Sequence, residues 1–204
     1  MEEFMKHHKQ NDLHRVVAGL AVISAVVLAG FSLPANADWY GAASLGRTDL
    51  QENVCSDLSA LGFTPCSEDK TDTGWKLSVG NQFNTNAALE FGYADLGEAK
   101  FNAAGVGCSL EADGFHASLV GSLPMANQFS FTGRVGLFRW NADVSCSAGG
   151  ASASADESGT DLTFGVGVRY DMTKSVGLRG EWERFDLDDA DVDMLSLGLI
   201  FSFK

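Results

Sequence analysis

After its first 37 residues the sequence has no long apolar run. The uncharged stretch at residues 16–33 covers 18 residues, and nothing later in the chain approaches that length. A transmembrane helix needs about 20 consecutive apolar residues. The sequence after residue 37 therefore excludes a membrane protein that crosses the bilayer with helices.

Basic residues are also scarce. Lys and Arg number 14 against 27 Asp and Glu, which gives a net charge of -13 at pH 7. A nucleic-acid-binding protein gathers Lys and Arg in a patch that neutralises phosphates. No such patch stands out here, so nucleic acid is excluded as a partner.

Residues 1–37 have the layout of a secretory signal peptide. Three basic residues precede the apolar run: Lys6, Lys9 and Arg15. The sequence Ala-Asn-Ala ends at Ala37, and a small-residue site of this kind marks signal-peptide cleavage, which would leave Asp38 as the first mature residue. A membrane anchor is the alternative, because 18 residues is about the shortest spanning length. Translation from Met5 rather than Met1 also stays open.

The rest of the chain alternates between apolar and polar residues. In residues 128–138, Phe129, Phe131 and Val135 share one face, while Thr132 and Arg134 lie on the other. This period of two is typical of β-strands. Eight segments follow it: residues 39–46, 74–83, 87–96, 114–123, 128–138, 161–170, 176–185 and 195–203.

The connections between these segments alternate in length. The short ones are residues 84–86, 124–127 and 171–174, and the long ones are residues 48–73, 97–113, 141–159 and 186–193. Short turns at one end and long loops at the other are typical of outer-membrane barrels with both termini in the periplasm. Residues 141–159 are rich in Ser, Ala and Gly, which predicts a flexible loop.

The polarity of the two faces separates a membrane barrel from a soluble one. One face carries Leu, Val and Phe, whereas the other carries Gly, Ser, Thr and isolated charges. A soluble barrel needs an apolar interior, and a barrel in lipid needs the reverse. Aromatic residues at the short-turn ends fit an interfacial girdle: Trp39, Tyr40, Phe83, Phe129, Tyr170 and Phe203. The sequence thus predicts an all-β protein, an eight-stranded antiparallel up-and-down transmembrane barrel over residues 38–204.

Three stretches resemble the outer membrane protein A/X-type barrel family. They are WYGAASLG from Trp39, GWKLSVGNQFNTNAALEFGYADLGE from Gly74 and RYDMTKSVGLRGEWERF from Arg169. The resemblance implies an outer-membrane location after Sec-type export, insertion by the barrel-assembly machinery, and contact with lipid and lipopolysaccharide. Two features depart from the family. The sequence ends with the barrel, without the peptidoglycan-binding domain of full-length members, and Lys204 follows the terminal aromatic Phe203.

Cysteines and inward charges are the candidate site residues. Four cysteines in an exported chain predict disulfides with three open connectivities; local pairing favours Cys55 with Cys66, leaving Cys108 with Cys146. Alternation aims five charged residues into the lumen, with Lys76 as a further candidate: Glu90, Arg134, Arg169, Arg179 and Glu181. Buried charges must pair, so we expect a network of salt bridges that fills the barrel. The resemblance implies the same for Glu90 and Arg179.

Two further features suggest chemistry. His116, two residues before Ser118, is the only histidine after residue 37, but the sequence shows no clear hydrolase motif around it. Residues 186–193 hold five Asp, a density that suits calcium, although the spacing matches no EF-hand. A solvated acidic loop is the expected role, and we predict neither a metal site nor a cofactor.

The expected function is a non-enzymatic envelope scaffold that displays disulfide-tied loops for surface interaction or adhesion, including a host ligand. A low-conductance pore is the first alternative. An outer-membrane enzyme centred on His116 is the second.

Overall fold

The computed structural model describes residues 38–52, 55–56, 60, 64–125, 127–188 and 190–203. The predicted signal peptide and Ala37 lie outside these residues. The described strands are β1 (Asp38–Leu50), β2 (Cys66–Asp69), β3 (Thr71–Asn84), β4 (Ala87–Ala103), β5 (Val106–Pro124), β6 (Phe129–Ala148), β7 (Ala151–Asp171), β8 (Val176–Leu187) and β9 (Ala190–Phe203). Within the described residues, no helix has the length and apolarity to cross a membrane.

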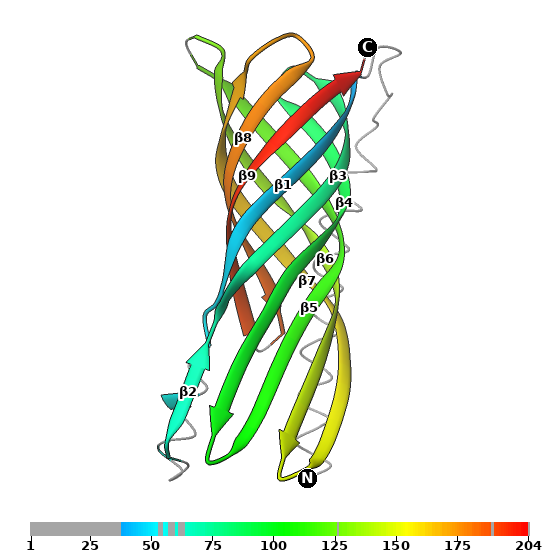
Figure 1. The fold of residues 1–204 in the computed structure, drawn as a ribbon. Coiled ribbons are helices and arrows are strands. Elements are labelled where there is room, and N and C mark those ends of the chain that lie inside the picture. Colours follow the sequence, from blue (N-terminus) through cyan, green and yellow to red (C-terminus); the bar gives the residue numbers. More distant parts are fainter. Residues whose placement is uncertain are drawn as a thin grey trace. The chain divides into compact units, whose positions relative to one another are not determined.

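Eight of these strands close into a barrel. Neighbouring strands pair in the order β4-β3-β1-β9-β8-β7-β6-β5, and a further pairing between β4 and β5 completes the ring. Every pairing is antiparallel. The short strand β2 lies outside the ring and pairs with the far end of β4 (Figure 1). The predicted eight-stranded up-and-down barrel is confirmed.

The outward face is apolar and exposed, as a surface in contact with lipid requires. Leu45, Phe115 and Leu197 are each 65% exposed. Ile200, which interrupts the apolar-polar alternation of the last strand, is 2% exposed and points inward. The predicted aromatic girdle is wrong at one position, because Tyr40 is buried in the lumen. Its neighbour Trp39 faces outward, as the alternation along a strand dictates.

Two of the predicted long loops are extensions of the strands. β4 and β5 continue to Ala103 and Val106, and β6 and β7 continue to Ala148 and Ala151, so that each hairpin ends in a two-residue turn. Figure 1 shows both hairpins running past the end of the β8–β9 hairpin. The prediction that residues 141–159 form a flexible loop is therefore wrong.

The turn residues explain these tight hairpins. Ala104 and Gly105 have φ of 49° and 84°, and Gly149 and Gly150 have φ of 56° and 89°. Two consecutive positive φ angles are the requirement of the type I′ turn, whose twist suits antiparallel strands. The Gly-Gly pair thus ends a regular hairpin where composition alone indicated flexibility.

The other two long connections are also shorter than predicted. β1 continues to Leu50, and β2 and β3 together occupy most of residues 66–84, so strands take up both ends of the predicted loop at residues 48–73. β8 runs to Leu187 and β9 begins at Ala190. Most of the acidic segment at residues 186–193 is therefore strand.

Candidate functional site

Six charged side chains meet inside the barrel, from β3, β4, β6 and β8. They are Lys76, Glu90, Arg134, Arg179, Glu181 and Glu183, and all six are buried. Three are cationic and three anionic, so their formal charges cancel. Isolated charges in such an interior would be very costly, and mutual pairing removes most of that cost.

Arg134 is the centre of this ionic cluster. Its Nη2 lies 2.5 Å from Glu90 Oε2, its Nε 3.1 Å from Glu181 Oε1, and its Nη1 3.3 Å from Glu183 Oε1. Because these carboxylates belong to β4 and β8, one guanidinium joins opposite parts of the wall. The ionic cluster therefore ties the barrel together across its lumen.

The other two cations complete the network. Arg179 pairs with Glu90 and places its Nε 3.0 Å from Glu181 Oε2. Lys76 pairs with Glu183 and has its Nζ 3.6 Å from Glu181 Oε2. Neutral hydroxyls add to it: Tyr40 donates to Glu90 Oε1 at 2.7 Å, and Thr163 donates to Glu183 Oε1 at 3.1 Å.

The predicted membership of the network needs two corrections. Arg169 is not part of it, since its Nε pairs with Asp171 at 2.7 Å near the short-turn end, where its side chain is 21% exposed. Glu183 belongs to the cluster but was missed. The signal was present in the sequence, because Glu183 has the same parity on β8 as Arg179 and Glu181.

Apolar layers lie inside the barrel beyond the ionic cluster. The larger layer, towards the long hairpins, includes Phe138, Phe185 and Met194, each 0% exposed. The rings of Phe138 and Phe185 meet edge to face with centroids 4.9 Å apart. A smaller group at the short-turn end comprises Tyr40, Ala42, Ala88, Val120 and Ile200. The predicted salt-bridge network therefore fills only the middle of the lumen, and apolar side chains pack the rest.

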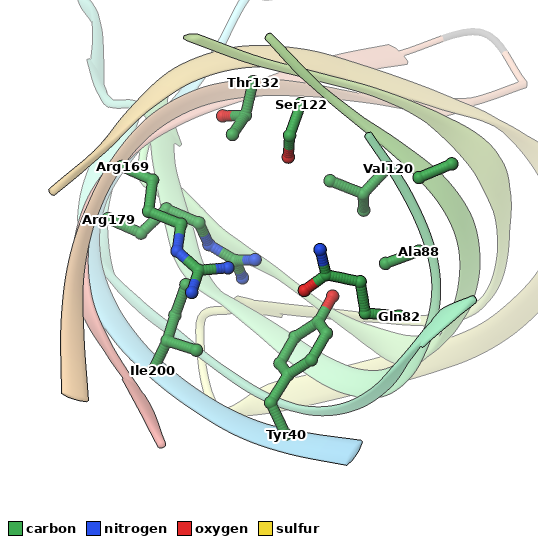
Figure 2. Close-up of a pocket in the computed structure, with 10 residues that line it drawn as sticks. Tyr40, Gln82, Ala88, Val120, Ser122, Thr132, Arg169, Arg179 and Ile200 are labelled. Atoms are coloured by element: carbon green, nitrogen blue, oxygen red, sulfur yellow. The ribbon is translucent and has the colours of Figure 1, made fainter. Parts of the chain in front are cut away.

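A small cavity remains at the short-turn end of the lumen. It has a volume of about 10 Å³, roughly the space of one water molecule. Figure 2 shows Tyr40, Gln82, Arg169 and Arg179 around this space. The buried hydroxyl of Thr132, which also lines it, has no hydrogen-bond partner among the described residues.

His116 points into the lumen, but it does not meet Ser118. Its Nε2 lies 3.2 Å from Ser78 Oγ, and Gly92 sits between these two residues in the register. A Cβ at Gly92 would lie 2.5 Å from His116 Nε2, so the glycine makes room for the imidazole. Nδ1 of His116 has no hydrogen-bond partner in the described part of the chain. The base, nucleophile and orienting acid of a hydrolase are therefore not assembled here.

The two disulfides both lie at the long-hairpin end. Cys55 pairs with Cys66 at the start of β2, with Cα atoms 5.5 Å apart. Cys108 pairs with Cys146, which lies directly opposite on β6, with Cα atoms 4.1 Å apart. One bridge thus ties β2 to the chain that follows β1, and the other crosses the β5–β6 pairing.

The carboxylates at this end are held by several kinds of partner. Arg184 binds both Asp191 and Asp193, with Nε 2.6 Å from Asp193 Oδ1. Backbone N–H groups of Glu98 and Thr73 donate to Asp72 and lower the pKa of its carboxyl. Among the residues with described positions, no three His, Cys, Asp or Glu side chains are arranged to hold a metal ion.

Comparison with known proteins agrees with this architecture. The family model of the outer membrane protein beta-barrel domain matches residues 18–203. The chain is 27% identical over 199 residues to Outer membrane protein A of Shigella flexneri, covering 90% of this chain and 55% of that protein. Its identity to Outer membrane protein A of Klebsiella pneumoniae is 24% over 184 residues, covering 83% and 52%. The chain thus spans about half the length of these relatives.

Solved structures share the fold at low sequence identity. The attachment invasion locus protein Ail of Yersinia pestis has a TM-score of 0.51 at 18% identity, over 80% of this chain and 98% of that one. Neisserial surface protein A has a TM-score of 0.52 at 16% identity, over 81% and 97%. The closed barrel, its apolar outer face and the family match show that the chain belongs to the outer membrane protein β-barrel family and is an integral protein of the outer membrane.

Proposed function

We propose that this protein is a non-enzymatic envelope scaffold that anchors extracellular hairpins for surface interaction or adhesion. The observation that carries the proposal is the filled lumen, in which a neutral ionic cluster lies between apolar layers. Eight strands enclose an interior that side chains fill. A barrel filled in this way gives the extracellular hairpins a rigid base and leaves no route for solutes through the lumen.

The long hairpins supply the displayed surface. In outer-membrane barrels the short turns face the periplasm and the long connections face outward. The β4–β5 and β6–β7 hairpins extend past the β8–β9 hairpin (Figure 1). The Cys108–Cys146 bridge joins these two hairpins, and the Cys55–Cys66 bridge holds β2, which pairs with β4. Cross-linked strands hold a surface in one shape, so a partner would meet a preformed site with little ordering cost.

Conductance and attachment measurements test this proposal. We expect purified protein in planar bilayers to show no steady unitary current. A stable current that changes in Glu90→Ala would contradict the scaffold and favour a low-conductance pore. Such a pore would use the hydroxyls of Ser118 and Thr132, which are buried without a hydrogen-bond partner among the described residues and offer sites for internal waters. Cells that express a variant with residues 143–156 replaced by a two-residue turn should keep the barrel and lose attachment to host-cell layers.

The start of β1 bears on how the protein is exported and inserted into the membrane. We infer that signal peptidase cleaves between Ala37 and Asp38 and that the barrel-assembly machinery then inserts the chain. Asp38 is the first residue of β1 and pairs with Gln82, so cleavage there would leave the whole strand in the mature protein. N-terminal sequencing of the outer-membrane form should begin at Asp38, and a chain that begins upstream of Ala37 would contradict this position.

A further inference from the structure

The β6–β7 hairpin has one bare edge beyond the barrel. Pairing between β6 and β7 runs without a register shift from Tyr170 to Ala151. Pairing between β7 and β8 begins only at Thr163, opposite Phe185. In the described part of the chain, residues 151–162 of β7 therefore pair with a strand on one side only, and β8 stops at Leu187, two residues past its last pair with β7.

The register shows which backbone groups face that edge. The N–H of Asp171 donates to Gln128 O, on the β6 side. Hydrogen-bonding direction alternates along a strand, so odd-numbered residues of β7 bond to β6 and even-numbered residues point the other way. The groups that face the bare edge are the N–H and C=O of Ser152, Ser154, Asp156, Ser158 and Thr160.

The opposite edge of the same extension is covered. There β2 pairs with β4 from Cys66 to Asp69, and the Cys55–Cys66 disulfide fastens β2 in place. Proteins usually protect a long edge with Pro, charged side chains or a bulge. Residues 151–162 contain no Pro and no Lys, and their pairing with β6 has no bulge. Their only charges are the carboxylates of Asp156, Glu157 and Asp161. These repel an acidic strand, so the bare edge is open to a basic one.

The side chains around the edge define what would fit. On the outer face, Glu98, Glu111, Asp143 and Asp156 stand opposite one another in a single row across β4, β5, β6 and β7. On the inner face, Ala153 and Ala155 continue an apolar surface that includes Val106 and Val144, which are 40% and 37% exposed. A strand beside β7 would meet carboxylates on one face and small apolar groups on the other.

We propose that this edge, residues 151–162 of β7, binds an extended basic segment of another protein by strand addition. Main-chain hydrogen bonds would give the affinity. Lys or Arg on the outer face would compensate the acidic row, and Val or Ala on the inner face would cover the apolar surface. A second copy of this chain fits less well. Its β7 would bring a further Asp156 against the acidic row, and the net charge of -13 opposes self-association.

Hydrogen exchange tests the edge directly. In detergent-solubilised protein, the N–H groups of Ser152, Ser154, Asp156 and Ser158 should exchange fast while those of the odd-numbered residues between them are protected. A peptide of about ten residues with alternating Lys and Val should protect the even-numbered set. The same peptide with alternate backbone nitrogens methylated should not protect these N–H groups, because it lacks the donors that strand pairing needs. Uniform protection of β7 without peptide would overturn the proposal, and if that protection rose with protein concentration it would identify a second copy as the occupant.

Edge variants provide the matched comparison. Ser154→Pro with Ser158→Pro removes two N–H groups that face the bare edge and leaves the hydrogen bonds to β6 intact. This change should weaken peptide binding by about tenfold or more. Ser154→Ala with Ser158→Ala should change it by less than about twofold. Gel electrophoresis checks that both pairs of variants fold, because a tight barrel changes its mobility when it is heated. Equal peptide affinity for the two pairs, with this heat-dependent gel shift present in both, would overturn strand addition. The inference rests on the proposed function, in which the hairpins are displayed at the surface. Peptide binding does not depend on the conductance and attachment measurements that test that function, so each proposal can fail without the other.

Discussion

Arg134 on β6 and Glu90 on β4 meet inside the barrel, with Nη2 of the arginine 2.5 Å from Oε2 of the carboxylate. These strands are not neighbours, since β5 lies between them. The salt bridge therefore joins parts of the wall that no backbone hydrogen bond connects. Both side chains are fully enclosed, and breaking such a pair leaves an uncompensated buried charge.

We predict that Arg179→Ala lowers the free energy of unfolding by about 3 kcal/mol or more, because Glu90 and Glu181 each lose a cationic partner inside the lumen. Urea unfolding in lipid vesicles measures this. Arg169→Ala is the matched control: its pair with Asp171 is partly exposed, so its loss should cost less than about 1 kcal/mol. Equal losses in the two variants would place Arg169 in the network after all.

The apolar layer gives a second prediction. Phe138→Ala should lower the free energy of unfolding by about 3–5 kcal/mol, because it leaves a cavity against Phe185 that the closed barrel cannot fill. Phe131→Ala removes the same ring from the lipid-facing side of the same strand, where Phe131 is 47% exposed. Lipid chains can occupy that space, so its loss should be clearly smaller. A larger effect at Phe131 would show that the lumen is loosely packed.

Removal of the Cys108–Cys146 bridge should loosen the hairpins without opening the barrel. We expect Cys108→Ser with Cys146→Ser to speed amide exchange around the Gly149–Gly150 turn and to leave exchange near Arg134 unchanged. The reason is that the bridge lies beyond the ionic cluster, between strands already paired by backbone bonds. A loss of the heat-dependent gel shift in this variant would contradict the prediction.

The acidic row gives a prediction about pH. A side-chain hydrogen bond with Asp156, with smaller contributions from desolvation and from the charges of Asp156 and Asp113, raises the pKa of Asp143 above its ordinary value of 3.8. A raised carboxyl pKa means that the folded hairpin holds this proton more tightly than the unfolded chain. Its stabilising effect is therefore present at low pH and is lost as the pH rises through the raised pKa.

Carboxyl-carbon NMR titration measures this directly. In Asp156→Ser the pKa of Asp143 should fall towards 3.8, because its hydrogen-bond partner and the neighbouring charge are both gone. Asp72 should show a pKa shift in the opposite direction, because backbone N–H groups lower the pKa of its carboxyl. A pKa of Asp143 that does not move in the variant would show that Asp156 is not its partner.

The sequence by itself determined the strands of the barrel and which of their faces meets lipid. Both follow from the period of two, because a strand that is apolar on one side has only one way to face a bilayer. The same parity predicts that Glu90, Arg134, Arg179 and Glu181 point inward, and local spacing favours the observed pairing of the cysteines.

Only the tertiary structure decided where along the barrel axis each inward-facing residue lies. The tilt and stagger of barrel strands offset neighbours along the axis. Arg169 therefore lies near the end of the barrel although it faces inward like Arg134, while Glu183 reaches the cluster. The same offset gathers Phe138, Phe185 and Met194 into one layer. It also leaves residues 151–162 of β7 with no strand paired on the side away from β6 in the described part of the chain, because pairing with β8 ends at Phe185 and β8 itself stops at Leu187.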